Sequence, residues 1–173
     1  MKSIQTIHLE DTKILEISPK TIFAALQNVK MLEKLVPGCK YIEKTKYKKS
    51  ISEVLVNLEN RECIFLNEHW TADIEPNSKI TVSITGNSGP AGRFTANLNI
   101  IITPEEDTTN FFYTVNATFY LKNVVLTKVN LESTAKQLME MFINNLQQQY
   151  TRKTAKTFGL FLAVKTLINK FYN

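Results

Sequence analysis

The chain has 173 residues, of which 43% are hydrophobic and 10% aromatic, so it can bury one core of ordinary size and is not an intrinsically disordered protein. The formal net charge is +5, yet the last 24 residues hold five basic and no acidic side chains, which leaves the rest of the chain neutral. This distribution excludes a uniformly basic nucleic-acid-binding protein.

Residues 12–18 are rich in β-branched side chains and predict a strand, which is followed by a helix that begins at Ser18 and Pro19. Ser is a common N-cap, and Pro is common at the first helical position. A second short helix is predicted over residues 30–35, and it ends at Pro37-Gly38.

From residue 40 to residue 119, apolar and polar side chains alternate with a period of two, which is typical of antiparallel strands that bury one face. Turn-forming residues interrupt this pattern and give about six or seven strands. The positions predicted to face inward are Val54, Val56, Leu58, Ile64, Leu66, Trp70, Ala72, Ile74, Ile80, Val82, Ile84, Phe94, Ala96, Leu98, Ile100, Ile102, Phe111, Tyr113, Val115, Ala117 and Phe119.

The period becomes helical after residue 126, and the spacing of apolar residues predicts a long amphipathic helix over about residues 128–149. A helix of this length spans roughly 33 Å, enough to cover a sheet whose apolar positions all lie on one face. We therefore expect an α+β domain over residues 1–149: a curved antiparallel sheet of about six or seven strands wrapped around the last long helix, with two short helices after the first strand. A cavity between sheet and helix is expected.

Three segments resemble the family of the carbon monoxide dehydrogenase G subunit, within the START-like helix-grip superfamily of lipid-binding proteins, pollen allergens and polyketide cyclases. Residues 18–26 are similar to the strand-to-helix entry of the family, and residues 86–94 lie where members carry a Gly-rich turn. Residues 35–43 contain Pro37-Gly38-Cys39, which matches the most specific segment of the three. The resemblance covers about residues 12–148, although the turn has fewer glycines, and the strand after it more Asn, than is typical.

The resemblance implies the helix-grip fold and a hydrophobic cavity rather than a catalytic centre. It also implies a role in the maturation or membrane recruitment of a molybdenum hydroxylase, or in carrying an apolar quinone between membrane and enzyme. Members often end in a membrane-associating tail. The family implies no metal or redox cofactor, and the two Cys and two His are scattered singly, which indicates no zinc site and no disulfide framework.

The turn over residues 86–92 contains Gly86, Gly89 and Gly92. A phosphate-binding loop would need Gly-Lys followed by Ser or Thr at the start of a helix, whereas here Arg93 begins a strand. Two interpretations stay open: a wide hairpin turn in which Gly adopts positive φ, and a flexible gate at the mouth of the cavity.

Glu68 interrupts the apolar stripe beside Trp70. If the alternation continues through this strand, the carboxyl faces inward, where burial raises its pKa and allows it to act as an acid or base or to bind a ligand carbonyl. A local bulge or a lysine partner would place it in solvent instead, which is the more common situation for Glu. Cys39 is interpreted as a small apolar residue at a strand start, because His8 and His69 are expected on wet faces and supply no base.

Aromatic and Met side chains lie on the predicted inner faces of the sheet and the helix, where they form either a solid core or the lining of a cavity. Periodicity does not distinguish these alternatives, and the resemblance favours the cavity. The predicted cavity residues are Glu68, Trp70, Phe94, Phe111, Tyr113, Met139 and Phe142.

Residues 150–173 predict a basic amphipathic tail helix. Its uncharged apolar run covers only residues 158–164, too short to cross a bilayer, which needs about 20 residues. The tail can lie on an anionic membrane surface, pack on its own domain as a prolongation of the last helix, or contact a second copy or an enzyme partner. The residues predicted to face the membrane are Arg152, Lys153, Lys156, Phe158, Phe161, Lys165, Ile168, Lys170 and Phe171.

The leading interpretation is a non-catalytic domain that binds an apolar ligand, a quinone or a lipid, without cofactor or nucleic acid. Its expected partners are an anionic membrane surface and a molybdenum hydroxylase. No apolar signal segment follows Lys2, so the expected location is cytoplasmic and peripheral on the inner face of the membrane. The alternatives are an aromatic cyclase or hydrolase that uses Glu68 or Tyr113, and a ligand-free protein adaptor with a filled core.

Overall fold

The computed structural model describes residues 2–59, 61–89, 91–122 and 126–171, with the side chains of residues 3–151 within these ranges. The predicted α+β order of elements is confirmed. The elements are β1 (Lys2–Leu15), α1 (Pro19–Gln27), α2 (Val29–Leu35), β2 (Cys39–Lys46), β3 (Lys49–Leu58), β4 (Arg61–Glu75), β5 (Lys79–Asn87), β6 (Gly92–Glu105), β7 (Thr108–Lys122) and α3 (Lys128–Phe171).

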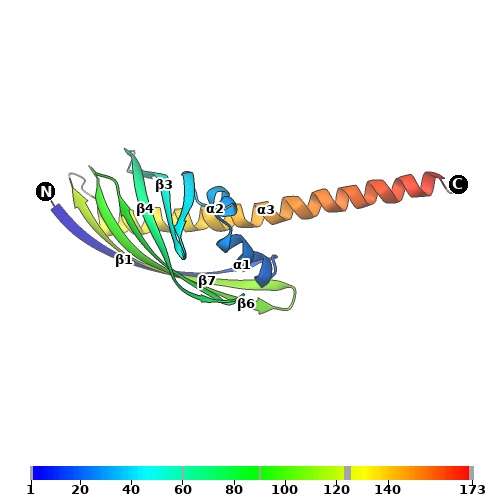
Figure 1. The fold of residues 1–173 in the computed structure, drawn as a ribbon, viewed down its shortest axis with the longest axis horizontal. Coiled ribbons are helices and arrows are strands. Elements are labelled where there is room, and N and C mark those ends of the chain that lie inside the picture. The colour runs from blue at the N-terminus through cyan, green and yellow to red at the C-terminus, as the bar shows by residue number, and fades with distance from the viewer. Residues whose placement is uncertain (1, 60, 90, 123–125, 172–173) are drawn as a thin grey trace.

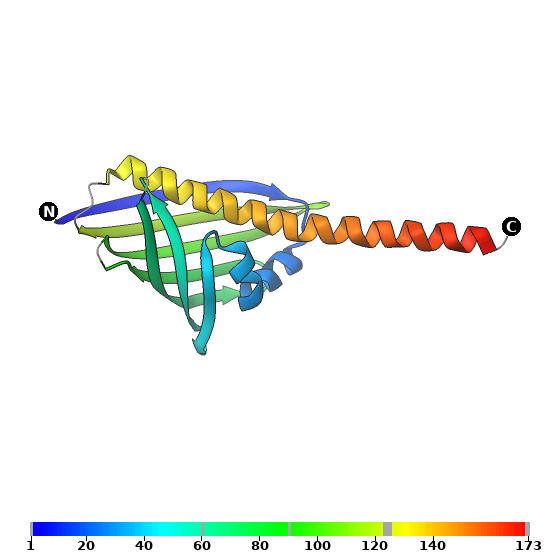
Figure 2. The ribbon, with the colours of Figure 1, turned by 90° about the horizontal axis from the view of Figure 1, so that it is seen from above.

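The seven strands form one antiparallel sheet in the order β1-β7-β6-β5-β4-β3-β2. Consecutive strands from β2 to β7 pair with one another, and β1 pairs with β7. The sheet curves around α3, which crosses its concave face, while α1 and α2 lie beside α3 at one end of the sheet (Figures 1 and 2). This arrangement is the expected helix grip.

Each of the two short helices begins at a polar N-cap residue. Ser18, as predicted, caps α1, and Asn28 caps α2. Ser18 Oγ accepts a hydrogen bond from the backbone N–H of Thr21 at 3.3 Å, and Pro19 begins α1. Asn28 Oδ1 accepts from the N–H of Met31 at 3.0 Å and so begins α2. Each cap satisfies a backbone donor that the first helical turn leaves unpaired.

Gly38 connects α2 to the sheet through a close backbone contact. Its φ is +70°, and its carbonyl accepts from the N–H of Leu55 in β3 at 2.9 Å. A Cβ on Gly38 would stand 2.1 Å from the carbonyl oxygen of Leu55. The Pro37-Gly38-Cys39 segment therefore needs Gly for two reasons, the left-handed backbone and the approach to β3.

Helix α3 has 44 residues and begins with reciprocal hydrogen bonds between Thr127 and Asn130. Its middle is fixed by Asn145, whose Nδ2 donates to the carbonyl of Leu35 at the end of α2, at 3.0 Å. The helix was predicted to end near residue 149, but it continues through residue 150 without a break and extends beyond the sheet (Figure 1).

The buried apolar side chains form two clusters along α3 rather than one. Both use the predicted helix stripe and the inner faces of the strands. Cluster 1, at the end near α1 and α2, contains Leu15, Ile17, Ile22, Phe23, Ala25, Leu35, Ile80, Ile100, Ile102, Phe111, Tyr113, Ile143 and Leu146. Cluster 2, at the start of α3, contains Ile7, Leu58, Phe65, Ala117, Leu121, Leu126 and Leu131.

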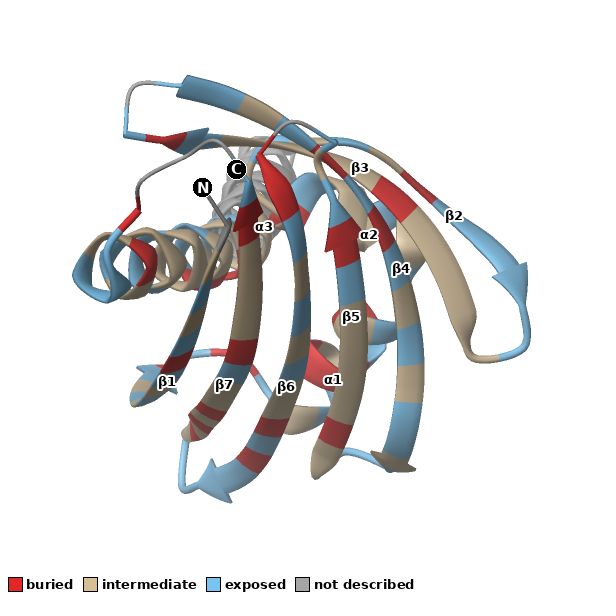
Figure 3. Ribbon diagram, turned by 90° about the vertical axis from the view of Figure 1, so that its left-hand side faces the viewer, coloured by how far each residue is buried: buried red, intermediate tan, exposed pale blue. Residues whose placement is uncertain are grey.

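The predicted inner face is correct for β3, β5, β6 and β7, but it is wrong for most of β4. Ile64 and Leu66 are 49% and 56% exposed, whereas Phe65 and Asn67, between and after them, are buried. A shift in register between Thr71 and Asp73 then reverses the alternation, so that Ile74 packs against cluster 1 as predicted. The bulge explains why one continuous alternation over the whole strand fails. Figure 3 shows the burial along each strand.

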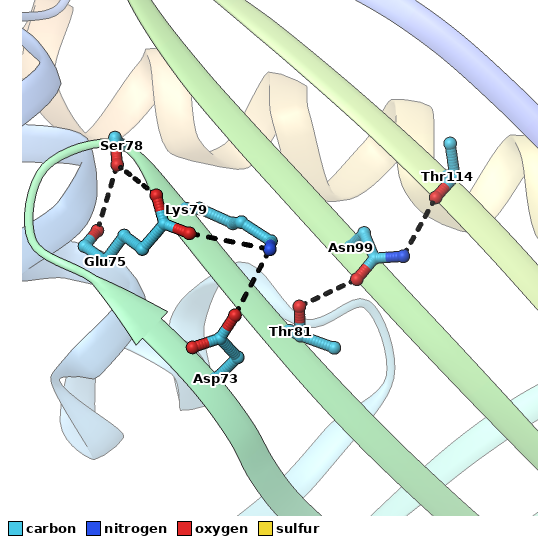
Figure 4. A network of polar contacts seen from close by, with 7 residues as sticks. All are labelled: Asp73, Glu75, Ser78, Lys79, Thr81, Asn99 and Thr114. Carbon is cyan, nitrogen blue, oxygen red and sulfur yellow. Dashed lines mark hydrogen bonds and ion pairs between the residues drawn. The ribbon is translucent and has the colours of Figure 1, made fainter.

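The outer face of the sheet is mainly polar. Lys79 Nζ lies 3.1 Å from Asp73 and 3.6 Å from Glu75, and Thr81 Oγ1 donates to Asn99 Oδ1 at 2.7 Å, with α3 behind the sheet (Figure 4). Cross-strand polar pairs of this kind suit a wet surface. Ile64, Leu66 and Trp70 are exposed apolar exceptions on this face, whereas both apolar clusters lie on the concave face.

Replacing Gly38 with Ala should lower the free energy of unfolding by about 2 kcal/mol or more, because a Cβ there meets backbone and the φ is positive. Gly89→Ala is the matched control. It also has positive φ, +49°, but nothing lies within 4 Å of its Cβ, so a loss of about 1 kcal/mol is expected. Urea unfolding measures both, and equal losses would contradict the assigned contact.

Candidate functional site

The concave face between the two clusters is apolar but only half-buried. From the sheet it presents Val82, Ala96, Leu98 and Val115, and from α3 it presents Met139 and Phe142. A fully packed core would bury such side chains completely. Partial exposure of apolar groups on an inner face indicates a surface that an apolar molecule can cover.

A groove of about 390 Å³ lies between the edge strand β1 and α3. The groove is open to solvent and most of its lining side chains are polar or charged, so it lacks the apolar lining of a typical small-molecule site. Beside it, Lys13 Nζ lies 2.8 Å from Asp11 and lowers the pKa of that carboxyl, while burial raises the pKa of Tyr113. The groove is lined by His8, Leu9, Glu10, Asp11, Tyr113 and Lys136.

Three polar side chains meet on the concave face of β3 and β4. Ser52 Oγ lies 2.7 Å from His69 Nε2, and Asn67 Nδ2 donates to Ser52 Oγ at 3.2 Å. Ser52 and Asn67 are only 2% and 6% exposed. Asn67 lies opposite Ser52 in the register and shares the face of buried Phe65, which places this polar trio inside the fold.

The hydrogen bonds of the polar trio assign a donor and an acceptor to each contact. Because Asn67 donates to Ser52, the hydroxyl proton of Ser52 is available to His69 Nε2, which accepts when the imidazole is neutral. Burial lowers the pKa of His69 and so favours this neutral form. The second N–H of the Asn67 amide donates to the carbonyl of Phe65 at 3.2 Å.

One acceptor of the trio has no partner. Asn67 Oδ1 is buried and receives no hydrogen bond from any described residue. An unpaired buried polar group costs about 1–3 kcal/mol. Exchanging the amide oxygen and nitrogen would not help, because an oxygen would then face the carbonyl of Phe65. The trio thus offers an unused hydrogen-bond acceptor on an otherwise apolar face.

The predicted cavity residues divide into three groups. Phe111, Tyr113, Met139 and Phe142 come together in and around cluster 1, where Phe111 and Tyr113 are fully buried. Phe94 lies on the inner face next to cluster 2, with its ring 5.5 Å from that of Phe65 and 5.6 Å from that of Phe119. The third group, Glu68 and Trp70, lies elsewhere.

The predictions that Glu68 and Trp70 face the cavity are wrong. Both lie on the outer face of β4, where Trp70 is 52% exposed. Lys49 Nζ lies 2.8 Å from Glu68 Oε2 and lowers the pKa of that carboxyl, the opposite of the shift that an acid catalyst needs. The lysine partner of the alternative interpretation is the one observed, but no bulge turns Glu68 outward, because the register is unbroken from Arg61 to Thr71 and Glu68 shares the outer face with Leu66 and Trp70.

The three predicted gate glycines occupy the hairpin between β5 and β6. A Cβ on Gly86 would stand 2.1 Å from Phe94 Cε1, and one on Gly92 would stand 2.1 Å from the carbonyl oxygen of Tyr120. Gly89 alone of the three has open space around it. Close packing therefore accounts for Gly86 and Gly92, in agreement with the hairpin interpretation of this segment.

Cys39 has the features of a structural thiol. It is half-buried, and burial together with nearby Glu33 raises its pKa, which disfavours the thiolate. Within the described ranges, no group of three or more His, Cys, Asp or Glu residues is placed to bind a metal ion.

The side chains predicted to face the membrane lie outside those that the structure describes. They are Arg152, Lys153, Lys156, Phe158, Phe161, Lys165, Ile168, Lys170 and Phe171. In the part of the chain that the structure describes, no helix combines the length and hydropathy needed to span a bilayer.

Sequence reasoning missed the polar trio because it assigned the apolar stripe of β4 to the interior. A usable signal was present in β3, where Ser52 has the parity of Val54, Val56 and Leu58 and so shares their inner face. No such signal was present in β4, because around His69 the outer face of this strand is more apolar than its inner face.

Acid should destabilise the fold through His69. Because its folded pKa is lowered, its contribution to stability is complete above the ordinary value of 6.5 and is lost progressively as the pH falls below it. His69→Gln should flatten the dependence of the free energy of unfolding on pH from about 7.5 down to about 5, measured by urea unfolding. An unchanged slope in a folded His69→Gln protein would refute the assignment.

Solved structures share this fold at low sequence identity. A conserved protein from Geobacillus kaustophilus superposes with a TM-score of 0.79 and 21% identity, over 84% of this chain and 96% of that one. An uncharacterised protein from Rhizobium leguminosarum gives 0.69 and 14%, over 88% and 99%. The Zhui aromatase/cyclase from Streptomyces sp. R1128 gives 0.62 and 12%, over 87% and 96%.

No curated protein matches the sequence. The family model for the G subunit of carbon monoxide dehydrogenase (CoxG), in contrast, matches residues 14–151, which contain β2 to β7, both short helices and the part of α3 that crosses the sheet. The helix-grip architecture, the Pro37-Gly38-Cys39 contact and this match agree, and the chain belongs to the CoxG family of carbon monoxide dehydrogenase.

Proposed function

We propose that this protein binds an apolar molecule, a quinone or a lipid, between the concave face of the sheet and α3. Through its basic tail it associates with an anionic membrane surface, and it serves the recruitment or maturation of a molybdenum hydroxylase of the carbon monoxide dehydrogenase type. Its membership of the CoxG family supports the partner. The binding domain is residues 1–149, and residues 150–173 form the tail.

The observation that carries the ligand proposal is the half-buried apolar surface between the two core clusters. Val115 packs against both clusters and is itself only half-buried, as are Leu98 and Met139 nearby. Ala96 and Ala135, which pack against cluster 2, are half-buried as well. Covering these groups with a ligand removes apolar surface from water, at about 25 cal/mol per Å².

The charge distribution supports the membrane proposal. The last 24 residues hold five basic side chains and no acid to neutralise them, and each Lys or Arg adds about 1 kcal/mol near an anionic surface. The backbone of α3 continues past the sheet rather than folding back over it (Figure 2). This course favours the membrane over packing on the same domain.

An enzyme of the same fold is the second candidate, favoured by the contact of 2.7 Å between Ser52 and His69. A nucleophile next to a base is the starting point of covalent catalysis. However, Ser52 is 2% exposed, and no described group orients the other ring nitrogen of His69 by a hydrogen bond. Binding without turnover is therefore the function we favour.

A larger side chain on the half-buried apolar surface should block ligand binding without destabilising the fold. Ala96→Phe should reduce the affinity for a decyl-substituted quinone about tenfold or more while leaving the free energy of unfolding unchanged or higher. Ala117→Phe is the control: Ala117 pairs with Ala96 across the strands but is only 5% exposed, so overpacking should cost about 1–3 kcal/mol. Calorimetric titration and urea unfolding measure both. Equal destabilisation would indicate a filled core and an adaptor, and consumption of the quinone would indicate an enzyme.

The tail should control membrane binding. Replacing Arg152, Lys153, Lys156, Lys165 and Lys170 with Gln should abolish flotation with vesicles that contain phosphatidylglycerol, and added salt should weaken flotation of the wild type. The control replaces three lysines of the sheet with Gln: Lys44 and Lys46, which are exposed, and Lys48 in the β2–β3 turn. This variant should float normally. Equal flotation of the tail variant would exclude the membrane proposal.

A further inference from the structure

The unpaired acceptor of the polar trio lies at the border of the half-buried apolar surface. In the cross-strand register Asn67 is followed by Gly86 of β5 and then by Phe94 of β6. In the next row His69 is followed by Ile84 and Ala96. Since neighbouring strands lie about 4.8 Å apart, Ala96 and His69 are separated by about 10 Å, within the length of one small ligand.

Phe94 lies next to this acceptor. The space above Gly86 is shared by Asn67 Oδ1 and the ring of Phe94, because a Cβ there would stand 2.5 Å from the first and 2.1 Å from Cε1 of the second. Phe94 is half-buried and borders the concave interior. Because Oδ1 is buried, a ligand can reach it only if a neighbouring side chain such as Phe94 moves aside.

The orientation of the Asn67 amide is fixed. Both of its N–H groups are used, one by Ser52 Oγ and one by the carbonyl of Phe65, each at 3.2 Å. Ser52 is fixed in turn by His69. The oxygen therefore points away from these partners, and only a group with a proton to donate can pair with it.

We infer that Asn67 Oδ1 accepts a hydrogen bond from a hydroxyl group on the apolar ligand. The site therefore prefers a ligand that carries a hydroxyl to the same skeleton carrying a carbonyl or an ether. This inference rests on the proposed apolar-ligand function and specifies its chemistry. Ser52 is a positioning residue, which holds the amide so that its oxygen stays available.

Hydroxyls of this kind occur on hydroquinones and on long-chain lipid alcohols. For the first source, the test compares a decyl-substituted hydroquinone, kept reduced without oxygen, with its quinone and its dimethyl ether. For the second, it compares a long-chain alcohol with its methyl ether. Calorimetric titration of the full chain measures each affinity. A preference in only one pair of probes identifies the source.

The wild type should bind the hydroxyl probe about tenfold more tightly than the ether, the effect of one hydrogen bond to a buried acceptor. In Asn67→Leu the preference should disappear while affinity for the ether remains. Asn97→Leu, at an exposed Asn of the outer face, is the matched control and should keep the preference. Ser52→Ala should reduce the preference in part.

Two outcomes would overturn the inference and leave the proposed function standing. One is equal binding of hydroxyl and ether probes by the wild type, a measurement that needs no variant. The other is a preference that persists in a folded Asn67→Leu protein, which would assign it to another group. If no probe binds at all, the apolar-ligand function itself fails, together with the inference.

Discussion

The sheet buries its concave apolar face against one long helix, and the other features of the fold depend on this packing. Strands β3 and β5 to β7 direct their apolar residues to the same side, and α3 supplies the stripe that meets them. The helix is held by Leu131 at one end of the sheet and by Leu146, with Asn145 bonded to Leu35, at the other. Between these anchors the cover is incomplete, and the ligand site that we propose occupies that interval.

The same packing explains why a polar trio can exist on the inner face. Asn67 lies next to Phe94, which borders cluster 2, and the hydrogen bond between Asn67 and Ser52 offsets part of the cost of burying both. A solid apolar core would not retain an unpaired amide oxygen at this position. The combination of apolar walls with one fixed acceptor is the usual composition of a small-molecule site, in which few polar groups set the orientation of the ligand.

Much of the fold could be predicted from the sequence. Strand alternation, the N-cap at Ser18, the stop at Pro37-Gly38 and the helical stripe from Leu131 to Leu146 are local patterns, and each predicted the correct element. Five of the predicted cavity residues lie on the inner faces. Glu68 and Trp70 do not, because the hydrophobic pattern of β4 favours the wrong face.

Three properties follow from the amino-acid sequence alone: the order of elements, the family, and the separation between a neutral domain and a basic C-terminal segment. Each depends on a local pattern, namely periodicity, motif or charge. Which face of β4 lies inside follows from folding instead. That choice is made by the register with β3 and by the bulge after Thr71, through contacts among Ser52, Asn67 and His69 on neighbouring strands. Such cross-strand contacts leave no periodic signal in one strand, and the polar trio could not have been found without them.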